Sequence, residues 1–243
     1  MRKRGADVLF MAEAYWDKEW ELQQQGFTYC YDKRLYDRLE HGPAESMRLH
    51  LCADLPYQEK LVRFIENHDE PRAATTFADQ KARAAAVTFA TLPGARLFHE
   101  GQFEGRRVRL PVFLRRRPDE VPDQNIQGFY QSLLQTLRRT DFKDGEWTLC
   151  ARTGWPDNDS YLNVVAWCWK KGADRHLIVV NLSGVRSQTR VRLPWGDLAG
   201  RSWRLTDPLQ KTAYDREGDD LQASGFYADL EPWGYHLLSR EPN

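Results

Sequence analysis

Two apolar runs near the start of the chain are each followed by a carboxyl side chain. Residues 8–12 lead directly into Glu13, and a second run over residues 61–65 leads a few positions later to Asp69. Short apolar runs bounded by polar residues are typical of buried strands in a parallel sheet. When parallel strands close into a barrel, the groups that do chemistry lie at the carboxyl ends of the strands. The sequence therefore predicts that Glu13 and Asp69 face one site.

A pair of carboxyl groups at one site suits chemistry on a glycosidic bond. One protonated acid releases the leaving oxygen, and one carboxylate attacks the sugar or stabilises an oxocarbenium-like centre. A glutamate at a strand end is usually only a solvated side chain, and His68 taken alone would more often be a structural histidine. The element Asn67-His68-Asp69 at a matching strand end makes the catalytic interpretation of Glu13 the stronger one.

The first part of the chain alternates strand-like and helix-like segments, which is the rhythm of an α/β fold. Helix formers dominate residues 16–25, and the alanine-rich residues 79–92 end at a Pro-Gly stop signal. Residues 44–60 have a less regular helical character, and residues 129–137 have apolar residues at helical spacing. The predicted strands lie at residues 8–12, 27–31, 61–66 and 95–99.

The second part of the chain, from about residue 145, has a different pattern. Short β-prone segments are separated by turns rich in Gly, Pro, Asn and Asp, which is typical of an antiparallel β-sandwich. These segments lie at residues 147–151, 162–169, 176–181, 189–193, 202–206 and 235–238. We therefore expect an α/β domain over residues 1–143 and an all-β antiparallel sandwich domain over residues 144–243.

The composition disfavours several classes of protein. Thirty-five basic residues balance thirty-five acidic ones, so we expect neither nucleic acid nor an anionic membrane as a partner. No apolar run approaches the length of a membrane span. The basic first residues are followed by an apolar stretch that is short and ends at Glu13, unlike a signal peptide, so we expect a cytoplasmic protein.

The cysteines and tryptophans each leave two interpretations. The four cysteines are scattered, at Cys30, Cys52, Cys150 and Cys168. Because they form no Cys-x-x-Cys pair and have no histidine at metal-ligand spacing, we expect reduced packing thiols, no metal site and no cofactor, whereas a secreted chain would favour two disulfides. Trp167 and Trp169 could form a sugar platform, but alternation along one strand favours packing in the core.

Three segments in a fixed order resemble the α-amylase superfamily of glycoside hydrolases and transglycosylases. They read FMAEAYW at residues 10–16, FIENHDEPR at residues 64–72 and PGARLFHEGQ at residues 93–102. Their order matches strands five, seven and eight of that family's barrel, and the Asn67-His68-Asp69 element is the most specific. The resemblance implies a partial (β/α)8 TIM barrel, strands five to eight with their helices, followed by the family's small β-sandwich. It also implies an α-glucan or maltooligosaccharide substrate.

The resemblance assigns roles to three residues directly. Glu13 resembles the general acid/base, which protonates the glycosidic oxygen and later deprotonates the incoming water or sugar hydroxyl. Asp69 resembles the carboxylate that holds the distorted sugar and favours the charged transition state. His68 resembles a hydrogen-bond donor to hydroxyls of the same sugar.

Three further residues are expected as neighbours of the substrate. They are Tyr15, Arg72 and Glu100, although Tyr15 could equally pack on the first helix. The family's usual eighth-strand ending, a Tyr-Gly-x-Glu-like run, reads His-Glu-Gly-Gln at residues 99–102. That departure leaves the role of Glu100 open.

The family's nucleophile has no counterpart among the three segments. It is an aspartate at the end of strand four, with an arginine two residues earlier, and one barrel unit takes roughly 30 residues because about 250 residues make eight units. Only twelve residues precede Glu13, too few for strand four with its helix and strand five. We therefore expect strands one to four, and the nucleophile, to lie outside this chain.

An open parallel sheet of four strands would leave two unpaired edges and an uncovered apolar face. Self-association, or a complementary chain that carries strands one to four, would cover them. Otherwise the chain would be prone to aggregation or partly disordered. Two hypotheses follow. The chain is half of a retaining α-glucan-active enzyme that works only with the missing half, or it is a non-catalytic truncated or glucan-binding remnant. The sequence does not distinguish hydrolysis from transfer to another sugar.

Overall fold

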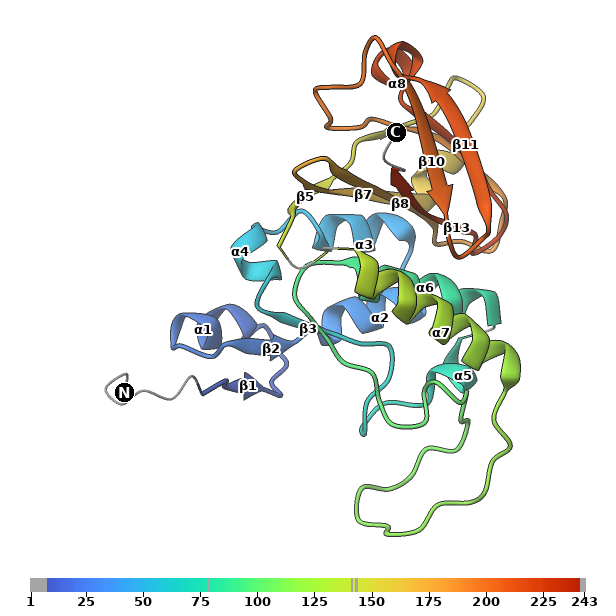
Figure 1. The fold of residues 1–243 in the computed structure, drawn as a ribbon. Helices are drawn as coiled ribbons and strands as arrows, with labels where there is room; N and C mark the ends of the chain where they lie inside the picture. Colours follow the sequence, from blue (N-terminus) through green and yellow to red (C-terminus); the bar gives the residue numbers. More distant parts are fainter. Residues whose placement is uncertain (1–7, 78, 141, 143, 241–243) are drawn as a thin grey trace.

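The computed structural model describes the chain except for residues 1–7, 78, 141, 143 and 241–243 (Figure 1). The first of these gaps contains the basic start of the chain, so the expectation about a signal peptide partly lies outside the described residues. No helix within the described ranges has both the length and the apolar character that crossing a membrane requires.

In the described part of the chain, four short strands form a parallel sheet with the order β1-β2-β3-β4. Cys30 pairs with Leu61 at its centre. The strands are shorter than predicted because the apolar pattern continues beyond the paired residues: Phe64 and Ile65 are fully buried but lie past the end of β3. The strands are β1 (Met11–Ala12), β2 (Tyr29–Tyr31), β3 (Leu61–Arg63) and β4 (Ala95–Arg96).

Helices connect these strands and follow the last one. Trp16 and Asp17 have φ angles of 64° and 66°, so the first helix begins later than the sequence predicts. The sequence analysis missed α2, which begins where the Asp32 carboxylate accepts a hydrogen bond from the Leu35 N–H. The helices are α1 (Glu19–Gln24), α2 (Lys33–His41), α3 (Ala44–His50), α4 (Leu55–Gln58), α5 (Ala73–Thr76), α6 (Asp79–Thr91) and α7 (Gln124–Arg139).

The remaining strands form two antiparallel sheets in the described chain, ordered β11-β10-β13-β8-β7-β5 and β12-β9-β6. The sequence analysis missed β11, because this edge strand is mostly exposed and lacks an apolar pattern. The elements are β5 (Glu146–Leu149), β6 (Arg152–Thr153), η1 (Ser160–Asn163), β7 (Val164–Lys171), β8 (Asp174–Asn181), β9 (Ser187–Val191), β10 (Ser202–Asp207), β11 (Thr212–Glu217), α8 (Gly218–Ser224), β12 (Phe226–Leu230) and β13 (Tyr235–Arg240). The architecture is therefore mixed α/β with a large antiparallel sheet.

Both faces of the six-stranded sheet are covered by other elements of the chain. One face, which includes Trp167 and Trp169, shares a hydrophobic core with the helices of the first part of the chain. The other face, which includes Cys168, packs against the three-stranded sheet. Trp167 is fully buried and the Trp169 indole donates to the backbone oxygen of Thr91 in α6, 2.7 Å away. These tryptophans are core residues, and the core continues across the predicted boundary at residue 143.

The cysteines are free thiols in the described chain. Cys30, Cys150 and Cys168 are buried, and Cys52 is exposed. The sulfur atoms of Cys150 and Cys168 lie 3.3 Å apart. Three of the four thiols therefore pack in the interior.

A buried ion pair joins β3 to the start of α2. The Arg63 guanidinium contacts the Asp32 carboxylate, which also lies 3.0 Å from His50 Nε2, and Arg63 Nη2 donates to Gln58 Oε1 over 3.0 Å. Burial acts to raise the pKa of Asp32, but Arg63 and His50 beside it lower the pKa to about 2. The network ties β3 to α2, α3 and α4.

Both edge strands of the parallel sheet carry features that lack a partner in the described chain. Residues 8–11, which lead into and begin β1, are apolar yet 50–70% exposed. In β4, the Nε of Arg96 is buried without a hydrogen-bond partner, and burial lowers the pKa of this guanidinium. An unpaired buried charge is unfavourable, and a carboxylate on a neighbouring strand would offset it.

Replacement of Arg63 by methionine should lower the free energy of unfolding by about 3–5 kcal/mol, because Asp32 would lose its main buried counter-charge. Urea denaturation at neutral pH measures this. Lys18→Met, which removes an exposed ion pair with Glu21, is the control and should leave the midpoint almost unchanged. Because the folded-state pKa of Asp32 is lowered, the stabilisation is present above about pH 4 and is lost as the pH falls toward 2. The variant should lose this part of the acid dependence, and an unchanged acid dependence would contradict the assignment.

The exposed edge at β1 should make the purified chain self-associate, because unpaired strand edges with apolar side chains join other chains. Size-exclusion chromatography with light scattering should show species larger than a monomer that grow with concentration. Leu9→Lys should reduce this association. Phe113→Lys should not, because this apolar residue, 84% exposed, lies on the long loop between β4 and α7 (residues 97–123). A monodisperse monomer at all concentrations would refute the expectation.

Candidate active site

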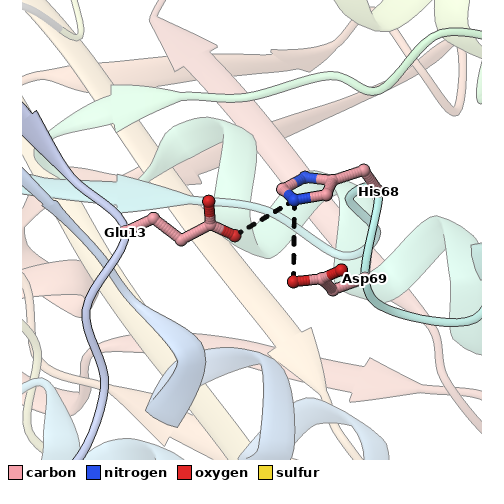
Figure 2. Close-up of side chains that lie close together, drawn as sticks. All are labelled: Glu13, His68 and Asp69. Atoms are coloured by element: carbon pink, nitrogen blue, oxygen red, sulfur yellow. Dashed lines mark ion pairs between the residues drawn. The ribbon is translucent and has the colours of Figure 1, made fainter. Parts of the chain in front are cut away.

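The parallel sheet brings the carboxyl ends of β1 and β3 to the same edge. Glu13 directly follows β1, and His68 and Asp69 lie in the loop that follows β3. Figure 2 shows the Glu13 side chain reaching from its own segment toward His68 and Asp69. The structure therefore brings together the three residues that the sequence predicts to act at one site.

The imidazole of His68 lies between the two carboxylates. Its Nε2 is 3.4 Å from Glu13 Oε1 and 3.6 Å from Asp69 Oδ2. The three atoms lie within 4.8 Å of one another. The side chains are 39%, 42% and 53% exposed for Glu13, His68 and Asp69. The cluster is open, so a substrate can reach all three groups.

Tyr15 belongs to the same cluster. Its hydroxyl donates a hydrogen bond to Glu13 Oε1 over 3.3 Å. Burial, and then the Glu13 carboxylate, raise the pKa of the Tyr15 hydroxyl. The structure thus places Tyr15 beside Glu13, where it orients the carboxylate.

Tyr31 is a neighbour of the cluster that the sequence analysis did not identify. It ends β2, the strand between β1 and β3, and its side chain is buried. Burial, followed by the Glu13 and Asp69 carboxylates, raises the pKa of its hydroxyl. The signal was available, because a strand that ends between two others delivers its last residue to the same edge.

The turn after β1 carries backbone strain and an exposed aromatic ring. Trp16 has a φ angle of 64° and is 84% exposed. Its ring meets that of Tyr15 edge to face, with the ring centroids 5.7 Å apart. Residues other than glycine with such angles are found at sites where the surrounding structure enforces them. Trp16 therefore presents a free ring face beside the cluster.

The loop that carries His68 and Asp69 is closed by buried polar contacts. Asn67 Oδ1 accepts hydrogen bonds from the backbone N–H groups of Asp69 and Glu70, over 2.9 and 2.8 Å. Glu66 is 1% exposed and accepts from Arg72 Nη1 and from the backbone N–H of Ala73, each over 2.6 Å. These contacts join the start of the loop at Glu66 to its end at Arg72 and Ala73.

Arg72 and Glu100 lie in this supporting cluster rather than beside Glu13. The Arg72 guanidinium is 3% exposed and donates to Glu66 and to the backbone oxygen of Glu100. The Glu100 carboxylate is 63% exposed and pairs with Arg117 of the long loop, and the hydrogen bond from Arg117 lowers its pKa. Contact of either residue with a substrate stays a prediction.

The donor atoms of Glu13, His68 and Asp69 are of types that also bind divalent cations. Within the described ranges, these three residues are a group whose side chains lie close enough together to hold a metal ion. Exposed acidic groups commonly lie together without a cation. The buried Nδ2 of Asn67 beside them lacks a hydrogen-bond partner among the described residues, but it is a donor that a metal ion would not satisfy. The predicted absence of a metal site stays a prediction.

No protein-family profile and no curated protein matches the sequence. Solved structures do match over almost the whole chain. A noncanonic maltogenic α-amylase, AmyB, from Thermotoga neapolitana is 18% identical, with a TM-score of 0.74 over 98% of this chain and 56% of its own. The α-amylase of Geobacillus thermoleovorans, solved with acarbose, is 13% identical, with a TM-score of 0.75 over 98% of this chain and 54% of its own.

A debranching enzyme from Nostoc punctiforme is 13% identical, with a TM-score of 0.67 over 96% of this chain and 50% of its own. The chain therefore spans about half the length of the structures that it matches. At these identities the similarity concerns the fold. The described chain has the fold that α-amylase-family glycoside hydrolases have over about half of their length.

Proposed function

We propose that this chain acts on α-glucosidic bonds as the acid/base-bearing half of a retaining glycoside hydrolase or transglycosylase of the α-amylase type. The observation that carries the proposal is the convergence of Glu13, His68 and Asp69 at the carboxyl edge of a parallel sheet. The shared fold with α-amylases supports it. The fold alone does not select a linkage, because a debranching enzyme has it too.

In this proposal Glu13 carries the proton. Its protonated carboxyl group donates to the glycosidic oxygen as the bond to the leaving group breaks, and the carboxylate later accepts a proton from water or a sugar hydroxyl. The Tyr15 hydroxyl, 3.3 Å from Oε1, holds the carboxyl group in orientation. Glu13 is partly exposed, so the incoming acceptor can reach it.

Asp69 and His68 act on the sugar that becomes positively charged. The Asp69 carboxylate stabilises the oxocarbenium-like centre electrostatically and accepts hydrogen bonds from sugar hydroxyls. His68 donates to a hydroxyl of the same sugar in place of one of its present carboxylate neighbours. The closed loop between Glu66 and Arg72 keeps both groups in position before the substrate arrives.

The nucleophile of a retaining reaction must come from elsewhere in this proposal. It would be a second carboxylate about 5–5.5 Å from the acid, on the opposite side of the sugar. A chain whose strand pairs with the free edge of β1 would bring its own strand end next to Glu13. The exposed apolar residues at 8–11 are the surface on which such a strand would pack.

A second candidate is a glucan-binding protein without catalysis. It is favoured by the exposure of Glu13, His68 and Asp69 to solvent and by the open edge of the sheet at β1 in the described chain. The open cluster would then bind sugar hydroxyls without breaking a bond. Activity after addition of the missing strands separates the two candidates.

By itself, the chain should show no measurable cleavage of starch or maltooligosaccharides. Activity should appear when a polypeptide that carries barrel strands one to four of an α-amylase is co-folded with it. In that complex Glu13→Gln should lower kcat by about 10²–10⁴-fold, the range that general acid–base catalysis contributes. Reducing-sugar release measures this, and Glu59→Gln, at an exposed glutamate, is the control that should keep full activity. A complex that binds glucan but never turns it over would favour the second candidate.

Asp69→Asn should also abolish most of the activity of the complex, because it removes the charge that favours the transition state. We expect a loss in kcat of about 10²-fold or more, with little change in the thermal unfolding midpoint, since Asp69 is exposed and outside the core. Asp157→Asn, at an exposed residue of the β-rich part, is the matched control. Turnover that survives Asp69→Asn would show that the chemistry is placed wrongly.

A further inference from the structure

The β-rich part of the chain has an open depression, with a volume of about 350 Å³, that contains none of the catalytic cluster. Its lining includes Thr153 of β6, Tyr161 of η1, and Trp155 and Asp159 of the turn between them. We call it the Trp155 depression. Trp155 is 39% exposed, whereas Trp167 in the core is fully buried. An indole this exposed on a concave surface is free to contact a ligand.

The indole of Trp155, which lines the depression, has the ring of Tyr227 beside it. The ring centroids of Trp155 and Tyr227 lie 6.3 Å apart, and the ring planes are inclined by 38°. Tyr227 lies on β12 and is 37% exposed. Aromatic faces pack well against the C–H faces of pyranose rings. Two inclined faces suit a chain whose successive rings turn relative to one another, as they do in an α-linked glucan.

The turn that carries Trp155 is held in place by its own hydrogen bonds. Asn158 Oδ1 accepts from the backbone N–H and the hydroxyl of Ser160, and Asn158 Nδ2 donates to the backbone oxygen of Gln188 over 3.1 Å. At Gly154, a Cβ atom would lie 2.4 Å from the Tyr161 ring, so the close approach requires glycine. A ligand therefore meets a surface that is already ordered, which reduces the entropy lost on binding.

Polar groups surround the aromatic surface. The exposed Asp159 lies in the lining of the depression, and the Arg190 guanidinium lies 5.8 Å from the Tyr227 ring centroid. Sugar hydroxyls donate to carboxylates and accept from guanidinium groups. Arg152 also lines the depression but is paired with Glu45, and the Asp159 carboxylate is exposed, so the depression does not suit a polyanion. The combination of aromatic faces with groups of both charges fits a neutral polyol.

We propose that the Trp155 depression is a second sugar-binding site, which holds a neutral oligosaccharide separately from the catalytic cluster. The identification of the oligosaccharide as an α-glucan rests on the proposed function. The identification of a sugar-binding site rests on the aromatic and polar geometry alone. The site would keep a long glucan chain attached while the other site acts on it.

The test is titration of the full chain with maltoheptaose, followed by calorimetry and by backbone amide NMR shifts. Trp155→Ala should weaken binding at this site by about tenfold or more, as expected when a central aromatic contact is removed. Trp155→Phe keeps an aromatic face and should keep most of the affinity. The matched control is Trp20→Ala, at a tryptophan that is 55% exposed and also lies near a tyrosine, with ring centroids 6.2 Å apart. Far-UV circular dichroism checks the fold of each variant.

The outcomes separate this proposal from the proposed function. Shifts at residues 153–161 and 227 that Glu13→Gln leaves unchanged support a second site, whatever the reconstituted enzyme does. Shifts confined to the surroundings of Glu13 and His68 would overturn the second site and leave the proposed function standing. Absence of maltoheptaose binding would also overturn it. So would a Trp155→Ala variant that changes its oligomeric state but keeps its affinity for the sugar.

Discussion

The geometry of the site depends on the buried ion pair between Glu66 and Arg72. The two side chains are 1% and 3% exposed, and their closest atoms lie 2.6 Å apart. A charge buried without its partner is strongly destabilising, so the loop between them is held in the conformation that satisfies both groups. His68 and Asp69 project from this closed loop toward Glu13. Their position is therefore set by contacts beneath the loop and does not require a bound sugar.

The parallel sheet is held in position mainly by the helices around it and by the core that they share with the six-stranded sheet. Its strands are only two or three residues long, too few for the ladder hydrogen bonds to hold the sheet alone. The helices around it instead share one core with the six-stranded antiparallel sheet, and the contact between Trp169 and Thr91 anchors α6 to that sheet. The four-stranded parallel sheet can thus keep its strand ends in register, while the edge at β1 and the unpartnered Nε of Arg96 have no neighbouring strand among the described residues.

The sequence predicted those parts of the fold and site that follow from strand direction. Glu13, His68 and Asp69 come together because β1 and β3 run parallel, and apolar runs before polar ends reveal this direction. Glu66 was not recognised as a support, because its role depends on Arg72 and Ala73, which reach it only after the loop closes. Tyr31 was overlooked although its place at the end of β2, between β1 and β3, gave a readable signal.

Local patterns also failed where burial does not follow periodicity. The strand β11 is mostly exposed and has no apolar pattern, so its pairing with β10 is what makes it a strand. The helix α2 had a readable signal, with Asp32 as its cap and apolar residues at helical spacing, which was overlooked. The inclined rings of Trp155 and Tyr227 could not be predicted, because these residues are far apart in the sequence and meet only through the pairing of β9 with β6 and β12.

The exposure of the cluster explains why position alone should not suffice for catalysis. Electrostatic stabilisation of a developing charge is strongest where water is excluded, because water screens the interaction between the carboxylate and the sugar. With Asp69 53% and Glu13 39% exposed, the cluster brings its side chains together but faces bulk solvent. Under the proposed function, the residues that supply the nucleophile would therefore also have to supply the walls that exclude water. Convergence of these side chains and exclusion of solvent are separable requirements, and the described residues meet only the first.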